Sequence, residues 1–368
     1  MIERAGLYVH VPFCLTRCGY CDFNAHAGLD ELKSPYVEAL QREADTTAAD
    51  WMGVRFASIF LGGGTPTTLP ASAIERLLGH LRDRFDVDPA AEVTCEANPD
   101  TVDRLSLAGL RAAGVTRLSL GVQSFDPATL AALERIHSPK SARHAYADAR
   151  AAGFDDVNLD LIYGADGEAV DGWRRTLDEA VALEPDHLAC YALTIEPGTP
   201  LGAKVAAGVV PAPDPDLQAE MFEHTCERLA KAGYRHYEVS NWALPGRESV
   251  HNLGYWEGRA YLGLGAGAHS FRGRRRWWNL RPPARYIGLA AKGSSPVGGE
   301  EHLTEEEARL EHVLLGIRSA DGLPSGDVPA EAARMLVDRG LATIERDRLA
   351  LTERGMLLAN EAVLALSP

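Results

Sequence analysis

Short apolar segments alternate with amphipathic segments over most of the chain, and this alternation restricts the fold more than any other feature of the sequence. The apolar, β-branched segments predict strands at 6–11, 57–61, 92–96, 117–122, 157–162, 187–193 and 234–239. The segments between them predict helices at 71–85, 105–113, 141–152, 173–183 and 217–232. Because such an alternation builds parallel strands joined by crossover helices, we expect an α/β fold with a full or partial (β/α) barrel. A doubly wound open sheet is the alternative.

The chain changes character after residue 245. Residues 246–300 hold closely spaced glycines, an arginine-rich stretch and several prolines, which predict a connector of loops and short pieces without a periodic helix. We therefore expect a barrel domain at 1–245, a connector at 246–300 and a third domain at 301–368.

The third domain is predicted to be small and mainly helical. Thr304 followed by Glu307 predicts a capped helix start, a second helix is expected at 331–339, and residues 341–351 are typical of a hairpin that precedes a last helix. This order of elements resembles a winged helix. Since residues 301–368 carry seven Arg and no Lys against thirteen Asp and Glu, a packing or lid domain is favoured over a DNA-binding one.

Composition argues against several classes of function. With 37 Lys+Arg against 52 Asp+Glu, the formal net charge is −15, which argues against nucleic acid or an anionic membrane as a partner. No uncharged apolar run approaches the roughly 18 to 20 residues of a membrane span, and the first residues lack the pattern of a signal peptide. We expect a cytoplasmic protein without a transmembrane segment, which would reach a membrane surface only through a partner.

Three cysteines form a cluster directly after the first predicted strand. Cys14, Cys18 and Cys21 have the spacing C-x3-C-x2-C. Three thiolates in one loop can each bind a different iron of a cubane cluster and leave the fourth iron open for chemistry. A structural zinc ion would require a fourth ligand, for which His26 is the candidate. The other cysteines fall in apolar patterns and are expected to be buried: Cys95, Cys190 and Cys226.

Polar or glycine-rich motifs follow the next predicted strands at the point where each strand ends. They lie at 61–66, 96–99, 121–125 and 158–164. Because the carboxyl ends of parallel strands meet at one face of a barrel, we expect these motifs to converge at its mouth. The backbone N–H groups of the glycines at 62–64 are expected to be free to bind a ligand.

The cysteine loop and the strand-end motifs together resemble the radical S-adenosylmethionine (SAM) superfamily. The match is closer to the group of the oxygen-independent coproporphyrinogen III oxidases and the haem chaperones, and it rests on Tyr8 to Cys14, Gly62 to Thr67, Gly121 to Phe125 and Asp160 to Gly164. The resemblance implies a partial (β/α) barrel of the radical-SAM type. Some members bind a second SAM, and the number for this chain stays open.

The resemblance also implies the residues that hold the cofactors. A [4Fe-4S] cluster would be held by Cys14, Cys18 and Cys21. Contacts to S-adenosyl-L-methionine would come from Tyr8, Tyr20, Gly63, Gly64, Thr65, Glu96, Gln123, Arg135, Asp160 and Ala192. Among these, a carboxylate can accept from ribose hydroxyls, and an amide can both donate and accept.

Two features place the chain with the haem-chaperone branch. Phe23 stands where the oxidases carry a fourth cysteine, and residues 251–256 resemble the H-N-x-x-Y-W haem-binding motif of the chaperones. The resemblance implies haem contacts from His251, Tyr255 and Trp256, which suit a haem site because imidazole is a common iron ligand and aromatic rings are flat and apolar. The implied function is to bind haem and to pass it to haem-accepting proteins.

Other interpretations stay open at this point. Arg272, Arg274, Arg275, Arg276 and Arg281 could receive haem propionates or an anionic partner, or they could form a solvated loop. One alternative function is that of an oxygen-independent coproporphyrinogen III oxidase, which decarboxylates propionates by radical SAM chemistry. Another is a zinc-stabilised binding module without redox function. Whether the chain is an enzyme therefore stays open.

Overall fold

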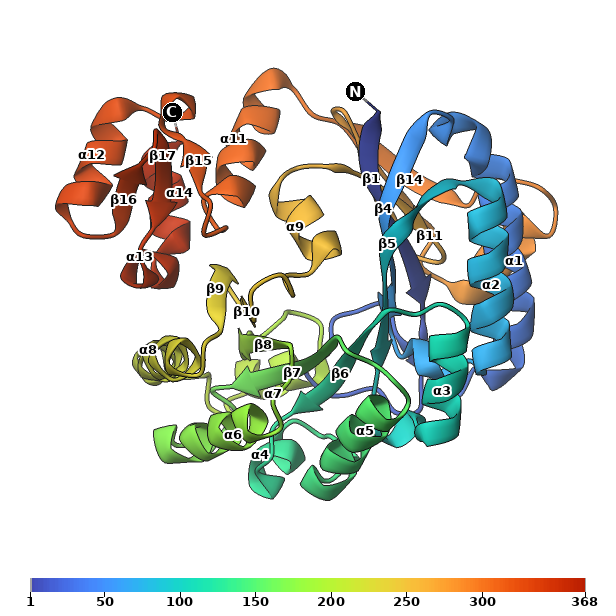
Figure 1. Ribbon diagram of the computed structural model, residues 1–368, viewed down its shortest axis with the longest axis horizontal. Coiled ribbons are helices and arrows are strands. Elements are labelled where there is room, and N and C mark those ends of the chain that lie inside the picture. Colours follow the sequence, from blue (N-terminus) through green and yellow to red (C-terminus); the bar gives the residue numbers. More distant parts are fainter. Residues whose placement is uncertain (1, 368) are drawn as a thin grey trace.

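A run of parallel strands forms the centre of one twelve-stranded sheet in the computed structural model, which describes residues 2–367. The strands are β1 (Glu3–Val11), β4 (Val54–Gly63), β5 (Asp86–Ala97), β6 (Arg117–Gln123), β7 (Val157–Tyr163) and β8 (His187–Ala192). Each strand pairs in parallel with the next in this order. The sheet curves around an open side (Figure 1), which confirms the predicted α/β fold with a partial barrel.

Amphipathic helices cover the convex face of this sheet (Figure 1). They are α1 (Lys33–Thr47), α2 (Ala71–Arg84), α3 (Arg104–Ala112), α5 (Pro139–Ala151), α6 (Val170–Ala182) and α8 (Pro215–Lys231). In α2, the apolar residues that recur at helical spacing are fully buried: Ile74, Leu77, Leu78 and Leu81. Since β6 is buried at every position, both of its faces are covered, and its apolar residues Leu118, Leu120 and Val122 pack in the core.

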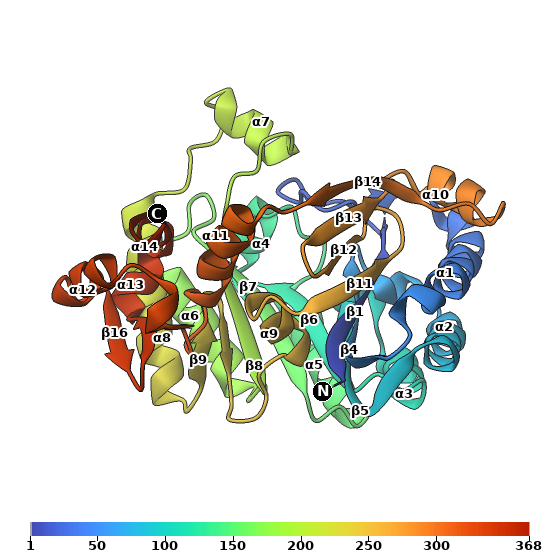
Figure 2. The same cartoon turned by 90° about the horizontal axis from the view of Figure 1, so that it is seen from above.

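Shorter elements lie at the strand ends and on the edge beyond β8. They are β2 (Phe13–Cys14), β3 (His26–Ala27), α4 (Pro127–Ala132), α7 (Pro200–Ala206), β9 (Arg235–Glu238), β10 (Asn241–Ala243) and the short turns η1 (Asp30–Leu32), η2 (Ala48–Trp51), η3 (Pro66–Thr68) and η4 (Pro99–Thr101). Figure 2 shows α7 standing apart from the sheet. The predicted strand at 234–239 is not a further parallel strand, because β9 pairs antiparallel with β10, which pairs antiparallel with β8.

The expectation of loops without a periodic helix at 246–300 is wrong. The segment forms α9 (Val250–Trp256), β11 (Ala260–Leu264), β12 (His269–Arg272), β13 (Arg275–Asn279), α10 (Pro283–Ala290) and β14 (Val297–His302). β11 pairs in parallel with β1, and the other strands extend the sheet in antiparallel order. The glycines allow close approach, since a Cβ at Gly263 would lie 2.0 Å from the carbonyl oxygen of His269. Partner strands stabilise these short polar strands, so local periodicity did not predict them.

The last part of the chain has the predicted elements. It comprises α11 (Glu305–Gly316), β15 (Leu323–Pro324), η5 (Ser325–Asp327), α12 (Ala330–Asp338), β16 (Ala342–Glu345), β17 (Arg348–Leu351), α13 (Glu353–Leu357) and α14 (Ala359–Leu366). Thr304 and Glu307 form the predicted capping box at the start of α11. The β16–β17 hairpin turns through Arg346 and Asp347, both at positive φ. The winged-helix resemblance and the domain boundaries stay predictions. No helix between residues 2 and 367 is both long and apolar enough to cross a membrane.

Candidate cofactor site

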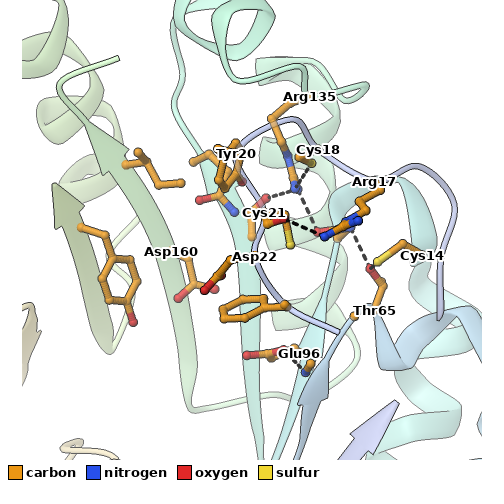
Figure 3. A pocket seen from close by; sticks show the side chains of 18 of the residues that line it. Cys14, Arg17, Cys18, Tyr20, Cys21, Asp22, Thr65, Glu96, Arg135 and Asp160 are labelled. Carbon is orange, nitrogen blue, oxygen red and sulfur yellow. Dashed lines mark hydrogen bonds between the residues drawn. The ribbon is translucent and has the colours of Figure 1, made fainter. Parts of the chain in front are cut away.

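A cavity of about 390 Å³ opens at the carboxyl ends of β4 to β8, beside the cysteine loop. Its lining includes the three clustered cysteines and most of the predicted SAM residues: Tyr20, Gly63, Gly64, Thr65, Glu96, Gln123, Arg135, Asp160 and Ala192. Figure 3 shows the cysteines, Arg135, Glu96 and Asp160 around this space. The strand-end motifs therefore converge as predicted.

Tyr8 is the predicted SAM residue that lies outside the lining of the cavity. Its hydroxyl hydrogen-bonds His10 Nδ1 at 2.9 Å, within β1. Its ring centroid lies 6.3 Å from that of Phe60 and 6.4 Å from that of His251. This position gives Tyr8 a supporting role in the sheet, and its contact to SAM stays a prediction.

The cysteine loop places three thiols at one wall of the cavity. Cys21 N donates to Cys18 O at 3.2 Å, which closes a turn between these two residues. Among residues 2–367, no three Cys, His, Asp or Glu side chains converge as ligands of a single metal ion. A cubane cluster does not need such convergence, because its thiolates bind different irons. His26, the fourth ligand in the zinc alternative, hydrogen-bonds Asn24 Oδ1 at 3.2 Å.

A chain of hydrogen bonds connects two of the cysteines. Arg135 Nη1 donates to Cys18 Sγ at 3.4 Å, and its Nη2 donates to Asn98 Oδ1 at 2.8 Å. Asn98 Nδ2 donates to Thr65 Oγ1 at 3.0 Å, and the Thr65 hydroxyl donates to Cys14 Sγ at 3.5 Å. Donors directed at sulfur stabilise negative charge on thiolates. This wall of the cavity therefore fits an iron–sulfur cluster.

Two carboxyl groups form the opposite part of the wall. Glu96 Oε2 accepts from Gly63 N at 3.0 Å, and burial together with the charge of Asp160 raises the pKa of Glu96 to about 8. Burial also raises the pKa of Asp160, although Asn158 Nδ2 and Ser119 Oγ donate to it at 2.8 and 3.0 Å. Buried carboxyls favour a ligand that brings positive charge or hydroxyl donors, and SAM carries both.

The expectation that the glycines at 62–64 offer free N–H groups is wrong. Gly63 N donates to Glu96, and Gly64 N donates to a backbone carbonyl of β1 at 2.9 Å. The glycines are required for space, since a Cβ at Gly63, which has φ 105°, would lie 2.2 Å from the His10 ring. This stretch therefore packs the end of β4 tightly against β1.

Sequence reasoning missed Asn98 and the backbone conformation of Gln123. Gln123 has φ 65° at a register shift between β6 and β7, and its side chain lines the cavity. Left-handed backbone at a non-glycine residue is costly and is enriched at functional sites. Asn98 directly follows β5 in the same motif as Glu96, so its place after a strand end was the available signal.

The predicted haem residues lie apart from the cavity. Helix α9 packs against β1 and β4 on the inner side of the curved sheet (Figure 1). His251 is 4% exposed, its Nδ1 hydrogen-bonds Ser58 Oγ at 2.9 Å, and its Nε2 hydrogen-bonds the Tyr255 hydroxyl at 3.0 Å. Burial lowers the pKa of His251 to about 3, so the ring is neutral. Burial raises the pKa of Glu238 to about 7, and Trp256 is among the neighbours that oppose this rise. Both ring nitrogens of His251 are thus occupied.

The arginine-rich stretch forms an ion-paired strand and turn instead of a solvated loop. Arg272, Arg274, Arg275 and Arg276 each pair with a glutamate of a neighbouring element, at 2.7, 3.6, 2.6 and 2.7 Å. These partners already neutralise the four charges, which leaves little support for a role in binding propionates. Arg281 differs, because it is exposed and has no ion-pair partner among residues 2–367.

The amino-acid sequence of the chain matches a protein superfamily and two proteins of known name. The radical SAM superfamily matches residues 8–180. Heme chaperone HemW of Mycobacterium tuberculosis (strain ATCC 25618 / H37Rv) is 45% identical over 97% of this chain and 93% of its own length. Heme chaperone HemW of Bacillus subtilis (strain 168) is 33% identical, and the match covers 96% of this chain and 97% of that protein's length.

A solved structure also matches over the full length of the fold. Coproporphyrinogen III oxidase HemN from Escherichia coli, a radical SAM enzyme, superposes with a TM-score of 0.85 at 25% identity, and the match covers 100% of this chain and 91% of that one. The cavity with its cysteine loop and strand-end residues agrees with these relationships. The chain therefore belongs to the radical SAM superfamily and, within it, to the HemW family.

Proposed function

We propose that the chain is a haem chaperone, which binds haem and delivers it to acceptor proteins, and that it carries a [4Fe-4S] cluster and SAM. One observation carries this proposal: the likeness to a protein named heme chaperone HemW, at 45% identity over 97% of the chain. That span includes both the cysteine loop and helix α9. The [4Fe-4S] cluster and SAM are the cofactors expected of a radical SAM protein. Delivery of haem to acceptor proteins is a further part of the proposal.

The cavity residues support the two cofactors. Cys14, Cys18 and Cys21 are the candidate ligands of three irons, and the open iron of such a cluster supplies SAM binding and reductive cleavage. The chain's own contribution is to donate hydrogen bonds to the sulfurs through Arg135 and Thr65. Glu96 and Asp160 also line the cavity, and we propose that they accept hydrogen bonds from the hydroxyl and ammonium groups of SAM.

The haem contacts of His251, Tyr255 and Trp256 stay a prediction, and the structure adds a condition to it. Iron can bind His251 only after Ser58 or Tyr255 has given up its hydrogen bond and α9 has shifted from the sheet. The neutral state of the ring suits such a role, because the neutral imidazole is the form that binds metals. A haem-loaded form should therefore show a displaced α9.

The location and the partners form part of the same proposal. The net charge of −15 suits a protein partner better than nucleic acid, and the buried cysteines outside the cluster suit a reducing compartment. We place the chain in the cytoplasm, with haem-accepting proteins as partners.

The oxidase is the second candidate, because HemN superposes with a TM-score of 0.85. It would use the same cavity for the propionates of coproporphyrinogen III. Phe23 argues against it, since this residue stands in the position of the fourth cysteine of the oxidases and its side chain is 60% exposed. An exposed phenyl ring cannot replace the chemistry of a thiol.

An anaerobic haem titration of the cluster-reconstituted protein, followed by its Soret band, tests the proposed function. We expect saturable one-to-one binding. His251→Ala should weaken it, whereas His144→Ala, an exposed histidine on the outer helix α5, should not. Absence of saturable binding by the wild type would contradict the haem chaperone. Binding that is indifferent to His251→Ala would contradict only the role of His251.

A further inference from the structure

A chain of buried hydrogen bonds runs from the cofactor cavity to helix α9. It begins at Asp160, which lines the cavity (Figure 3). It passes through Asn158 on β7, His187 on β8 and Tyr237 on β9. It ends at Ser249, the N-cap residue of α9. The three residues between the ends are at most 4% exposed, so the chain runs through the interior of the protein.

The register of the sheet brings the first residues of this chain together. Asn158 and Asp160 lie two positions apart on β7 and therefore point to the same face, and Asn158 Nδ2 donates to Asp160 Oδ1 at 2.8 Å. His187 is the partner of Asn158 across the β7–β8 pair, and its Nδ1 lies 2.6 Å from Asn158 Oδ1. The other ring nitrogen, Nε2, lies 2.7 Å from the Tyr237 hydroxyl, which accepts from Ser249 N at 3.3 Å.

The direction of each bond in this chain follows from its neighbours. Because Asn158 turns its NH₂ group to Asp160, its oxygen faces His187, so Nδ1 of that ring carries the proton. Burial lowers the pKa of His187 well below its usual value, so the ring is neutral and Nε2 accepts from the Tyr237 hydroxyl. The Tyr237 oxygen accepts from Ser249 N. Every group thus donates toward the cavity, and each bond polarises the next in the same sense.

The contacts at the start of α9 oppose the movement that haem requires. Glu92 accepts from Val250 N at 2.9 Å and from His251 N at 3.2 Å. Tyr237 accepts from Ser249 N in the preceding turn. Iron can reach His251 only after α9 has shifted from the sheet. A ligand that strengthens the hold on Ser249 therefore opposes the binding of haem.

The cavity end of the chain is sensitive to positive charge. Asp160 receives hydrogen bonds from two neutral groups, Asn158 Nδ2 and Ser119 Oγ. The sulfonium and ammonium groups of SAM would bring positive charge into the cavity, which favours the ionised form of this carboxyl. An ionised carboxylate is the stronger acceptor, so each bond from Asn158 back to Ser249 would become stronger. The hold on α9 would increase with it.

We propose that His187 is a positioning residue shared by the two sites: through Asn158 it orients Asp160 toward SAM, and through Tyr237 it holds the start of α9. The binding of SAM and the binding of haem therefore weaken each other, by the same factor in both directions. This inference rests on the proposed function and adds an order of events to it. Bound SAM keeps α9 on the sheet, and loss of SAM releases the helix for haem.

Anaerobic haem titrations with and without SAM test this linkage. The cluster is kept oxidised, so that SAM is bound but not cleaved. For the wild type, we expect saturating SAM to weaken haem binding about fivefold, and haem to weaken SAM binding by the same factor in a calorimetric titration. The effect should reach a plateau as the SAM concentration rises, because linkage saturates whereas direct competition for one site does not.

Two variants interrupt the chain. Tyr237→Phe removes one hydroxyl and keeps the ring, and His187→Phe removes the middle of the chain; both should bind haem equally well with and without SAM. Tyr234→Phe is the matched control, because its buried hydroxyl donates to Pro185 O at 2.6 Å outside the chain, and it should keep the fivefold effect. A merely structural defect would weaken haem binding with and without SAM and leave the ratio unchanged. Circular dichroism and the cluster absorption verify that each variant is folded.

The outcomes separate this inference from the proposed function. Equal haem affinity of the wild type with and without SAM would overturn the inference and leave the haem chaperone standing. An effect of SAM that grows without a plateau, or that persists in the folded variants, would do the same. Absence of saturable haem binding by the wild type would overturn both.

Discussion

Replacement of Glu96 by glutamine is expected to stabilise the cofactor-free protein and to weaken its binding of SAM. Burial raises the pKa of Glu96 to about 8. A carboxyl whose pKa is higher in the folded than in the unfolded chain favours the protonated form on folding. The wild type therefore loses folding free energy as the pH rises from about 4.5 toward 8. Glutamine is neutral throughout, and its amide oxygen can still accept from Gly63 N.

The magnitude follows from the pKa and from the setting of the side chain. At pH 7, a carboxyl with these two pKa values costs on the order of 3 kcal/mol of folding free energy. Glu96 keeps partial contact with the open cavity, so water screens part of this cost. We expect Glu96→Gln to gain about 1 to 2 kcal/mol at pH 7 and well under ~1 kcal/mol at pH 5. The positive charge of bound SAM favours the ionised form of Glu96, which glutamine cannot adopt, so the substitution should weaken SAM binding about tenfold.

Two assays measure the opposing effects. Urea unfolding of the cofactor-free proteins at pH 5 and pH 7 gives the change in stability, and calorimetric titration of the reconstituted proteins with SAM gives the change in affinity. Glu75→Gln, at an exposed position on α2, is the matched control and should change neither. A Glu96→Gln protein that is no more stable than the wild type at pH 7 would refute the reasoning.

Three further predictions concern the cluster and the core. Cys18→Ala removes a cluster ligand, so anaerobic reconstitution with iron and sulfide should leave it nearly colourless while the wild type turns brown and absorbs at roughly 400 nm; a colourless wild type would favour the zinc alternative. Asn98→Ala breaks the donor chain between Arg135 and Thr65, so the midpoint potential of the cluster should become more negative in an EPR-monitored titration; an unchanged potential would contradict the role of this chain. Trp173→Ala removes a fully buried indole that donates to Met221 O and Thr225 Oγ1 at 3.2 and 2.9 Å, and urea unfolding should show a loss of about 3 to 5 kcal/mol; a loss below ~1 kcal/mol would contradict the packing of α6 on α8.

The central sheet and the cavity could be predicted because both follow from local patterns. The closely spaced apolar residues of β6 and β7 indicate buried strands, and motifs that follow successive parallel strands must meet at one edge of the sheet. Glu96, Arg135 and Asp160 come together for this reason. The cysteine loop adds three thiols at the carboxyl ends of these strands, where the strand order already brings the polar motifs together.

Contacts between distant segments could not be predicted from the same patterns. The hydrogen bond between Ser58 and His251 joins residues 193 positions apart. It holds His251 in a buried position, which the motif at 251–256 alone does not indicate. The strands β12 and β13 likewise depend on their partners, which turn an arginine-rich stretch into a ladder of ion pairs. The glycines at 62–64 appeared to offer free N–H groups because their neighbours on β1 lie some fifty residues earlier in the chain.

One measurement separates the haem chaperone from the oxidase most directly. The reconstituted protein is incubated without oxygen with SAM, a strong reductant and coproporphyrinogen III, and a parallel sample of the same preparation receives equimolar haem. The account predicts that the coproporphyrinogen is recovered unchanged and that the haem is bound one to one. Repeated turnover to a product in which the propionates have become vinyl groups, without stoichiometric haem binding, would contradict it.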